Sequence, residues 1–336
     1  MNNARMALGL TIKTEPAATE PPTPPSNPVH AIAIADILRC PRCRSGLSIG
    51  EEYRCANPRC SLNRQAFLFT RGQPVLVDFA KSIVRAVDLE YSPAPARPKW
   101  REALAKFATT KNHVSERILA DIRHRLLSAG GRPRLLIVGG GAIGQGLEQL
   151  YETAEIEVIA TDIYASDVTT LVADGHQLPF AEESMDAVVI QAVLEHVLAP
   201  HQVVAEIHRV MKPHALVFAD TPFIQQVHGR AYDFMRFTVS GHRWLFKNFT
   251  IIEAGASLGA GAALIWSMRY FIRALTGSWK LGTAFALLFF WLRFLDSNSR
   301  NQQDAASGVY FFGTKSIQTI KPTDMIAFYE QQARAG

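Results

Sequence analysis

The chain has 336 residues, of which 48% are hydrophobic and 19% charged, and its formal net charge is +5. This size allows one large domain and a small one, and the composition is that of a globular protein with an unusually apolar region. The mild positive charge does not by itself indicate nucleic-acid binding, and it would equally suit contact with an anionic membrane surface. The N-terminus lacks the basic–apolar–small order of a secretory signal, so we expect a cytoplasmic protein.

Residues 1–30 form the first segment. Six prolines fall between residues 16 and 28, and apolar side chains are few. Such a composition cannot bury a core, so it predicts a disordered tail.

The four cysteines of the chain all lie in the next segment, residues 31–80. They form two short pairs, Cys40 with Cys43 and Cys55 with Cys60, separated by eleven residues. Two such knuckles can place four thiolates around one tetrahedral zinc ion, and four thiolates leave no open position for catalysis. We therefore predict a structural zinc ribbon, with free buried cysteines as the alternative.

Residues 81–130 predict a helical lead-in. Prolines 93, 95 and 98 mark a linker, and then Val114, Ile118, Ile122 and Leu126 repeat at four-residue steps. This spacing puts them on one face of a helix, which Gly130 would end.

A glycine loop follows. Leu135–Val138 reads as a buried strand and runs directly into Gly139, Gly141 and Gly144. Glycines at this spacing allow a tight turn and a close approach of the backbone to a ligand. A second apolar strand, 156–160, ends just before Asp162, roughly where a ribose would be held by its hydroxyls. The pattern indicates a site for a nucleoside-containing cofactor.

Strand and helix patterns alternate through the rest of the chain. Residues 185–190 and 215–219 read as buried strands, a helix with Val203 and Ile207 lies between them, and 308–315 reads as a closing antiparallel strand. This alternation predicts an α/β sheet with helices on both faces.

Residues 132–254 and 308–315 resemble class I S-adenosylmethionine-dependent methyltransferases of the small-molecule type. The resemblance depends on the glycine loop, Asp162, Asp174 before Leu178-Pro-Phe180, and Leu194-Glu-His-Val197. It implies a Rossmann-like, seven-stranded methyltransferase domain over residues 131–320. It also implies a set of residues that contact the donor: Gly139, Gly141 and Gly144 beneath its methionine and ribose, Asp162 and Ile163 at the ribose, Asp174, Gly175 and His176 at the adenine, and Gln191 and Ala192 flanking it.

Residues 36–79 resemble the zinc-ribbon family that activates or precedes methyltransferases. The shared features are a Cys-Pro-x-Cys knuckle, a second cysteine pair and a Gly-x-Pro-hydrophobic ending.

One position departs from the methyltransferase pattern. The family usually has an acid two residues before the first glycine, where it helps to hold the donor's amino group, and this chain has Ile137. Weakened donor binding, a substitute group from elsewhere and an inactive enzyme all stay open.

The acceptor side is expected after the strand that ends at Pro222. The run His228-Gly-x-x-Tyr232-Asp233-x-x-Arg236-Phe-Thr resembles methyltransferases encoded with bacterial polysaccharide and glycan pathways. It suggests an acceptor oxygen or nitrogen on a small molecule or a lipid-linked glycan precursor. As alternatives, Asp233 and Arg236 would only pair to fix the loop, and His196 would only pack a helix. The catalytic candidates are His196, His228, Tyr232, Asp233 and Arg236.

An apolar helical insertion is predicted at 256–296. It holds basic residues such as Arg269 and Lys280 but no acidic residue before Asp296, and its longest uncharged run near the end, twelve residues, is too short to span a bilayer. Such helices suit a membrane interface, and equally a helical cap or a homodimer contact.

Two other functions compete with methyl transfer. A nicotinamide-dependent oxidoreductase shares the glycine loop and the distant acid, and a scaffold protein that kept the fold but lost catalysis would fit Ile137. Asp174, the Leu-Glu-His-Val run and the closing strand favour the methyltransferase.

Overall fold

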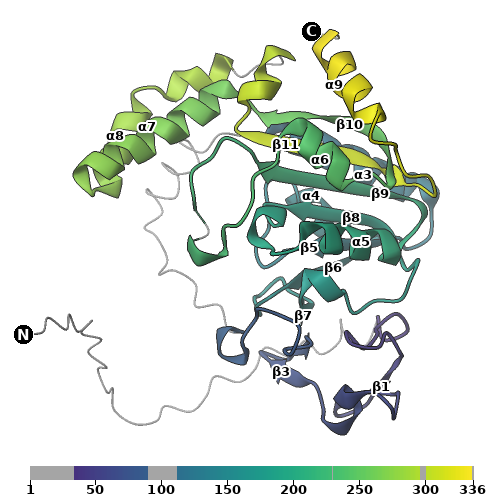
Figure 1. The fold of residues 1–336 in the computed structure, drawn as a ribbon. Coiled ribbons are helices and arrows are strands. Elements are labelled where there is room, and N and C mark those ends of the chain that lie inside the picture. The colour runs from purple at the N-terminus through teal and green to yellow at the C-terminus, as the bar shows by residue number, and fades with distance from the viewer. Residues whose placement is uncertain (1–33, 90–111, 229, 296–299, 335–336) are drawn as a thin grey trace, which may run out of the picture.

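The computed structural model describes residues 34–89, 112–228, 230–295 and 300–334. The predicted tail and the proline linker lie outside these residues. A central nine-stranded sheet dominates the described part of the chain, with the strand order β10-β11-β9-β8-β5-β6-β7-β4-β3 (Figure 1). Helices cover both of its faces, so the predicted fold class is confirmed.

Seven of these strands come from the segment predicted to form the methyltransferase domain. Neighbours from β7 through β6, β5 and β8 to β9 are parallel, whereas β11 is antiparallel to both β9 and β10. The predicted closing antiparallel strand is therefore confirmed. The strands are β5 (Arg134–Val138), β6 (Glu157–Asp162), β7 (Leu171–Ala173), β8 (Met185–Gln191), β9 (Met211–Pro222), β10 (Phe249–Leu258) and β11 (Gly308–Lys315).

The strands separate two hydrophobic clusters because successive side chains point to opposite faces of a sheet. On one face, Leu136 and Val138 pack with α5 (Pro200–Val210) and α6 (Val239–Leu245). On the other face, Leu135 and Ile137 pack with α3 (His113–Ala129) and α4 (Glu148–Tyr151). The helix predicted from the spacing of Ile118, Ile122 and Leu126 is α3, and these three residues are buried against the sheet.

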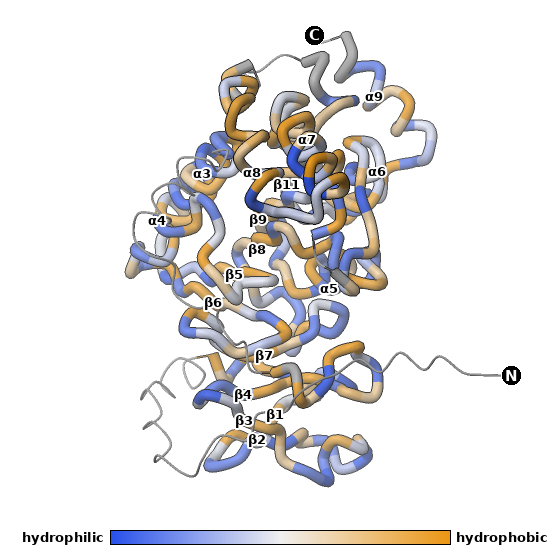
Figure 2. Tube along the Cα trace, turned by 90° about the vertical axis from the view of Figure 1, so that its left-hand side faces the viewer, coloured by the Kyte–Doolittle hydropathy of each residue, from blue (hydrophilic) through white to orange (hydrophobic). Residues whose placement is uncertain are grey.

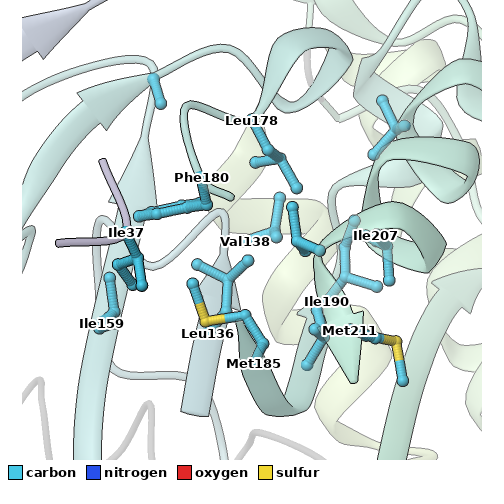
Figure 3. Packing of buried hydrophobic residues seen from close by; sticks show 14 of the residues in the cluster. Ile37, Leu136, Val138, Ile159, Leu178, Phe180, Met185, Ile190, Ile207 and Met211 are labelled. Carbon is cyan, nitrogen blue, oxygen red and sulfur yellow. The ribbon is translucent and has the colours of Figure 1, made fainter. Parts of the chain in front are cut away.

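The cysteine-bearing module is continuous with the main sheet. Its small hairpin, β1 (Leu47–Ile49) with β2 (Tyr53–Cys55), stands apart, but β4 (Gln73–Leu76) pairs in parallel with β7, and β3 (Leu68–Thr70) adds the last strand. Ile37 of the module packs in the same cluster as Leu136 and Phe180 (Figure 3). The Gly-x-Pro-hydrophobic ending of the predicted ribbon thus contributes β4, which extends the main sheet.

One local prediction differs from the structure. Strand β9 begins at Met211, directly after α5, and contains Pro213, whereas the sequence predicted a strand only over residues 215–219. The sheet tolerates this proline because the pairing of β8 with β9 shifts register between Met185 and Ala187, where a ladder N–H is not needed. A C-terminal helix, α9 (Asp324–Arg334), lies beyond the predicted domain end.

The predicted insertion forms a helical hairpin, α7 (Ala260–Thr276) and α8 (Trp279–Leu287), which projects from the end of the sheet opposite β3 (Figure 1). Much of both helices is hydrophobic in Figure 2. Among the described residues, no helix combines the length and the apolar character needed to cross a membrane.

Candidate functional site

The glycine loop and Asp162 meet at the carboxyl ends of β5 and β6. The N–H of Gly141 donates a hydrogen bond of 2.8 Å to Oδ2 of Asp162, and the N–H of Ile163 donates one of 2.7 Å to Oδ1. A Cβ atom at Gly141 would lie 2.6 Å from the same Oδ2 and 2.5 Å from the hydroxyl of Tyr164. Any larger residue at Gly141 would therefore push these groups apart, which explains why the loop needs glycine here.

Burial raises the pKa of Asp162 to about 6, and the hydrogen bonds from Ile163 and Gly141 only partly oppose this effect. A carboxylate with a raised pKa beside a glycine loop is a frequent mark of a functional site. It is ionised at neutral pH and can accept further hydrogen bonds from a ligand.

Gly139, the first glycine of the loop, has a φ of +78°. A Cβ atom there would overlap the side chain of Val193, which follows β8. Gln191 also reaches the loop, because its Oε1 lies 3.0 Å from where a Cβ at Gly144 would be. Ala192, between them, has a left-handed backbone with a φ of +52°, and its N–H donates to the carbonyl of Asp220 at 2.9 Å. The predicted donor residues after β5, β6 and β8 therefore lie together.

Asp174 follows β7, and its carboxylate accepts three hydrogen bonds. Oδ1 accepts hydrogen bonds from the N–H of His176 at 2.9 Å and from Nδ1 of the same residue at 2.6 Å, while the hydroxyl of Ser82 donates to Oδ2. Nε2 of His176 accepts from the N–H of Ala199 at 3.1 Å, so the ring proton is on Nδ1. Burial alone would raise the pKa of Asp174, but the hydrogen bonds from His176 and Ser82 lower it below its usual value.

Gly175, the remaining predicted adenine residue, lies between two core side chains. A Cβ at this position would be 3.4 Å from Val203 and 3.6 Å from Val138, which is ordinary packing contact. The residue follows Asp174 directly, so the predicted adenine group lies together at the end of β7.

Ile137 occupies the position where the family resemblance places an acid. Its side chain is 2% exposed and belongs to the hydrophobic cluster between the sheet and α3. A carboxylate in this cluster would be desolvated without a partner. The isoleucine thus completes the core beneath Gly140, where an added Cβ atom would lie 3.1 Å from the isoleucine side chain.

The acceptor candidates are assembled by the segment between β9 and α6. Nδ1 of His196 lies 2.7 Å from the carbonyl of Tyr232, and the N–H of His228 donates to Asp233 at 2.7 Å. Asp233 also forms a two-point ion pair with Arg236, whose guanidinium donates to the carbonyls of Gln225 and Gln226. The pairing considered as an alternative from the sequence is present, and it fixes the loop. The ring of Tyr232 is largely exposed, so its backbone rather than its phenol contacts the cluster.

Helix α7 supports this loop from outside. The hydroxyl of Tyr270 donates to the carbonyl of Val227 at 3.1 Å, and Nε2 of Gln226 donates to Ser267 at 3.1 Å. Trp266 lies beside the ring of His228, with the centroids 6.5 Å apart. The inner face of the insertion therefore covers the acceptor loop. Thr238 caps α6, because its hydroxyl accepts a hydrogen bond from the N–H of Gly241 at 3.0 Å.

The four cysteines converge in the N-terminal module. Their sulfur atoms all lie within 4.8 Å of one another, with Cys43 to Cys55 at 3.4 Å and Cys40 to Cys60 at 3.9 Å. Four sulfurs on a tetrahedron with metal–sulfur bonds of about 2.3 Å are about 3.8 Å apart. The donor set fits zinc in both number and spacing.

Several residues near the site were not singled out from the sequence. Ser82 bonds to Asp174 from 92 positions away. The carboxylate of Asp220 accepts hydrogen bonds from Asn112 at 2.6 Å, Ser115 at 3.1 Å and Ser257 at 2.7 Å, and so ties α3 and β10 to β9. Glu195 lies fully buried beside the two histidines. Of these residues, only Asp220 and Glu195 could have been found from the sequence, because an acid next to the end of a parallel strand lies at the ligand-binding edge of the sheet.

Comparison with known proteins agrees with the fold. Residues 136–219 match the family model described as a methyltransferase domain. No curated protein sequence matches the chain. A Galdieria sulphuraria protein, provisionally assigned as a sarcosine dimethylglycine methyltransferase, is 14% identical over 60% of this chain and 85% of its own, with a TM-score of 0.42. The phosphoethanolamine N-methyltransferase 2 of Haemonchus contortus, solved with S-adenosyl-L-methionine, is 17% identical over 60% of this chain and 52% of its own, with a TM-score of 0.40. At these values the two structures bear on neither substrate nor mechanism.

The matched segment covers β5 through most of β9 and includes the glycine loop, Asp162, Asp174 and the residues after β8. Over this segment, which is less than half of the chain, the protein is therefore similar to a methyltransferase domain.

Proposed function

We propose that this protein transfers a methyl group from S-adenosylmethionine to an oxygen or nitrogen of a small or lipid-linked acceptor. The observation that carries the proposal is the buried carboxylate of Asp162, held by the N–H of Gly141 at the edge where β5, β6 and β8 end. A carboxylate in this position accepts hydrogen bonds from the two ribose hydroxyls of a nucleoside.

The segment after the glycine loop favours this donor over a dinucleotide. Dinucleotide sites place a pyrophosphate on the N-terminus of a helix that follows the loop directly. Here α4 begins only at Glu148, has four residues, and carries that acidic side chain in its first turn. A pyrophosphate would meet a negative charge there, whereas S-adenosylmethionine has no phosphate groups to place at this helix.

The chemistry asks mainly for positioning. The acceptor atom forms a bond to the methyl carbon in line with the carbon–sulfur bond, which breaks and leaves its electron pair on sulfur. The loop at Gly139 and Gly141, with Asp162, would hold the donor. The acceptor loop, fixed by Asp233 and Arg236, would present the nucleophile from the other side.

Calorimetry with S-adenosylmethionine and, separately, with NAD tests this function. We expect heat of binding with the first alone, and binding at least about tenfold weaker in Asp162→Asn, which is about 1.4 kcal/mol. The matched control is Asp167→Asn, because the side chain of Asp167 is 87% exposed on the same β6–β7 connection. Binding of neither ligand would exclude both enzymatic functions and favour the scaffold protein.

We also propose that Cys40, Cys43, Cys55 and Cys60 hold one structural zinc ion. The sulfur spacing described above supports this, as does the small size of the module, which gains folding energy from a metal. Metal analysis of the purified protein should find one zinc per chain on these ligands. Its absence, or a Cys43→Ser variant with unchanged zinc content and stability, would contradict the assignment.

The outer face of the insertion is the proposed contact with an anionic membrane surface, where a lipid-linked glycan precursor would be found. Leu264, Phe271 and Leu275 are exposed along one face of α7, and Leu281, Phe285 and Leu288 are exposed on and just after α8. No acidic residue occurs between Glu253 and Asp296, which suits an anionic surface.

Vesicles with anionic lipid test this contact. They should retain the protein at low salt, and Phe271→Asp should release it. Ile317→Asp is the control, because Ile317 is 98% exposed outside the hairpin. If the protein is a dimer in solution and does not bind the vesicles, this face would instead be the contact with a second copy of the chain.

A further inference from the structure

The side chain of Glu195 is the least expected group near the acceptor loop. It is 0% exposed, and neither of its carboxylate oxygens has a hydrogen-bond partner among the described residues. Burying a carboxylate without compensation is strongly unfavourable, because its hydration is lost and nothing replaces it. A positive charge close to Glu195 would offset this cost.

Two imidazole rings face this carboxylate. Nε2 of His196 lies 3.5 Å from Oε1 of Glu195, and Nε2 of His228 lies 3.7 Å from the same atom. Each ring is 27% exposed, so the cluster is open to solvent on its imidazole side. Both distances are too long for a direct N–H to oxygen hydrogen bond.

The other nitrogen of each ring shows where its proton is. Nδ1 of His196 lies 2.7 Å from the carbonyl of Tyr232, and Nδ1 of His228 lies 3.2 Å from the carbonyl of Gln226. A carbonyl only accepts, so each Nδ1 donates the proton and each neutral ring turns the lone pair of Nε2 toward Glu195. Two lone pairs and one carboxylate then converge, and none of them supplies a positive charge.

The spacing fits a metal ion at the centre of these three atoms. Ligand atoms at about 2.1 Å from an ion are about 3.4 Å apart at a tetrahedral angle and about 3.0 Å apart at a right angle. The observed 3.5 and 3.7 Å lie just above this range, and the ligand atoms of all three residues lie within 4.8 Å of one another. A backbone carbonyl that accepts from the second ring nitrogen is also the usual support of a histidine ligand.

We propose that Glu195, His196 and His228 bind one divalent transition-metal ion at the acceptor side of the site. One carboxylate and two imidazoles suit Mn²⁺, Fe²⁺, Co²⁺ or Zn²⁺, and they leave coordination positions for oxygen ligands. The ion is distinct from the zinc of the four cysteines. His196 and His228 are then ligands that bind through Nε2, and neither needs to act as a general base.

The site also narrows the acceptor class, and this step rests on the proposed function. A hydroxyl bound to the ion has a lowered pKa and releases its proton to solvent. The resulting oxygen attacks the methyl carbon, the carbon–sulfur bond breaks, and the electron pair stays on sulfur. The acceptor is accordingly a hydroxyl compound that can also ligate a metal, such as a vicinal diol of a sugar. Because Val193 contacts the loop at Gly139, the ligands Glu195 and His196 are only two and three residues from the donor side.

Titration of the full chain with Mn²⁺, with the zinc of the four cysteines left in place, tests the site when it is followed by electron paramagnetic resonance. Mn²⁺ prefers oxygen and nitrogen ligands, so the four thiolates do not compete for it. We expect one bound Mn²⁺ per chain and binding at least about tenfold weaker in His228→Ala, since one of three ligands is lost. His201→Ala, an exposed histidine on α5, is the matched control and should bind Mn²⁺ as the wild type does.

The outcomes separate this proposal from the proposed function. No bound Mn²⁺, or equal binding by the wild type and His228→Ala, overturns the metal site even if S-adenosylmethionine binds. The positive charge would then be a proton on His228, whose pKa Glu195 raises. One bound Mn²⁺ that His228→Ala loses supports the site even if S-adenosylmethionine does not bind, and in that case methyl transfer fails. A circular dichroism melt of each variant confirms that it is folded, and His196→Ala repeats the test at an independent ligand.

Discussion

The two proposed halves of the site, one for the methyl donor and one for the acceptor, are built in different ways. The donor half consists of strand ends and backbone, with Asp162 held by amide groups and Asp174 held by Ser82 and His176. The acceptor half is a loop fixed by one ion pair, Asp233 with Arg236, and by contacts from α7. The ends of the strands cannot move without disturbing the hydrophobic core. The loop of the acceptor half, by contrast, can change in sequence or conformation while the core stays intact. The difference indicates a constant donor site and an acceptor site that can adapt to another substrate.

The sharpest test of this division is Gly139→Ala. Alanine is strained at a φ of +78° and would overlap Val193. We expect S-adenosylmethionine to bind at least about 100-fold more weakly, or about 2.8 kcal/mol, in calorimetry. Mn²⁺ binding should stay within about twofold of the wild type if the two halves are independent.

Gly277→Ala is the matched control for this variant. Gly277 also has a positive φ, +66°, but it ends α7 and a Cβ there would meet nothing within 4 Å. Its donor affinity should be unchanged. Equal loss in both variants would mean that general destabilisation, and not the donor half, is being measured.

The second test addresses the N-terminal module as a support of the donor half. Cys43→Ser removes one of the four sulfurs, and β4 pairs with β7, which ends just before Asp174. We expect a lower melting temperature and donor binding weakened by about tenfold, or about 1.4 kcal/mol. Ser48→Ala, on β1 and away from the sulfurs, serves as the control. A Cys43→Ser protein with full donor affinity would show that the module is only an appendage.

The third test uses pH. Burial raises the pKa of Asp162 to about 6, so roughly a quarter of the carboxylate is ionised at pH 5.5. Donor affinity should therefore fall about fourfold between about pH 7.5 and pH 5.5 in the wild type. Asp162→Asn should bind weakly at both values, with no such trend.

The stability of the folded protein should change with pH in the opposite direction to donor affinity, so that it is higher at low pH. The folded-state pKa of Asp162 is raised above its usual value of 3.8. Its contribution to the free energy of unfolding is therefore greatest below pH 3.8 and is lost as the pH rises through about 6. Asp220, whose pKa burial also raises to about 6, adds to this trend. Thermal melts between about pH 4 and pH 7 would detect it, and Asp162→Asn should reduce the slope.

The smallest change in donor binding is expected for Arg236→Ala. This variant leaves the carboxylate of Asp233, 1% exposed, without its guanidinium partner, so the loop should open. Hydrogen exchange should become faster in residues 225–228 and 230–238, while donor affinity stays within about twofold. Weakened donor binding here would mean that the two halves are coupled through Glu195, whose carbonyl accepts from the N–H of Phe234.

The sequence was most informative where structure is local. The strand before Gly139, the acid after the second strand and the helix that contains Ile118 and Ile122 each depend on neighbouring residues, and all appear in the structure. Contacts between distant segments could not be read in the same way. Ser82 reaches Asp174 only because β4 joins the sheet. A strand of four residues has too short a pattern of alternating apolar and polar residues to predict which strand it pairs with.

The acceptor side shows the same limit. Both histidines were found from a motif, but their convergence on Glu195 depends on how a segment of about thirty residues returns to the end of β8. The role of the insertion also needed the structure, since the inward face of α7 reads as apolar in the same way as its exposed face. The contacts of Trp266, Ser267 and Tyr270 with the acceptor loop distinguish the two faces.

The pairing of β4 with β7 has a consequence for the solubility of the protein. Without residues 34–80, β7 would present unpaired N–H and C=O groups at the edge of a parallel sheet, and such edges pair with other chains. In the full protein the strand at this edge of the sheet is β3, which has only three residues and runs antiparallel to β4. A short outer strand offers little template for aggregation. The segment from β5 to β11, expressed without residues 34–80, should therefore precipitate even if its hydrophobic core still folds.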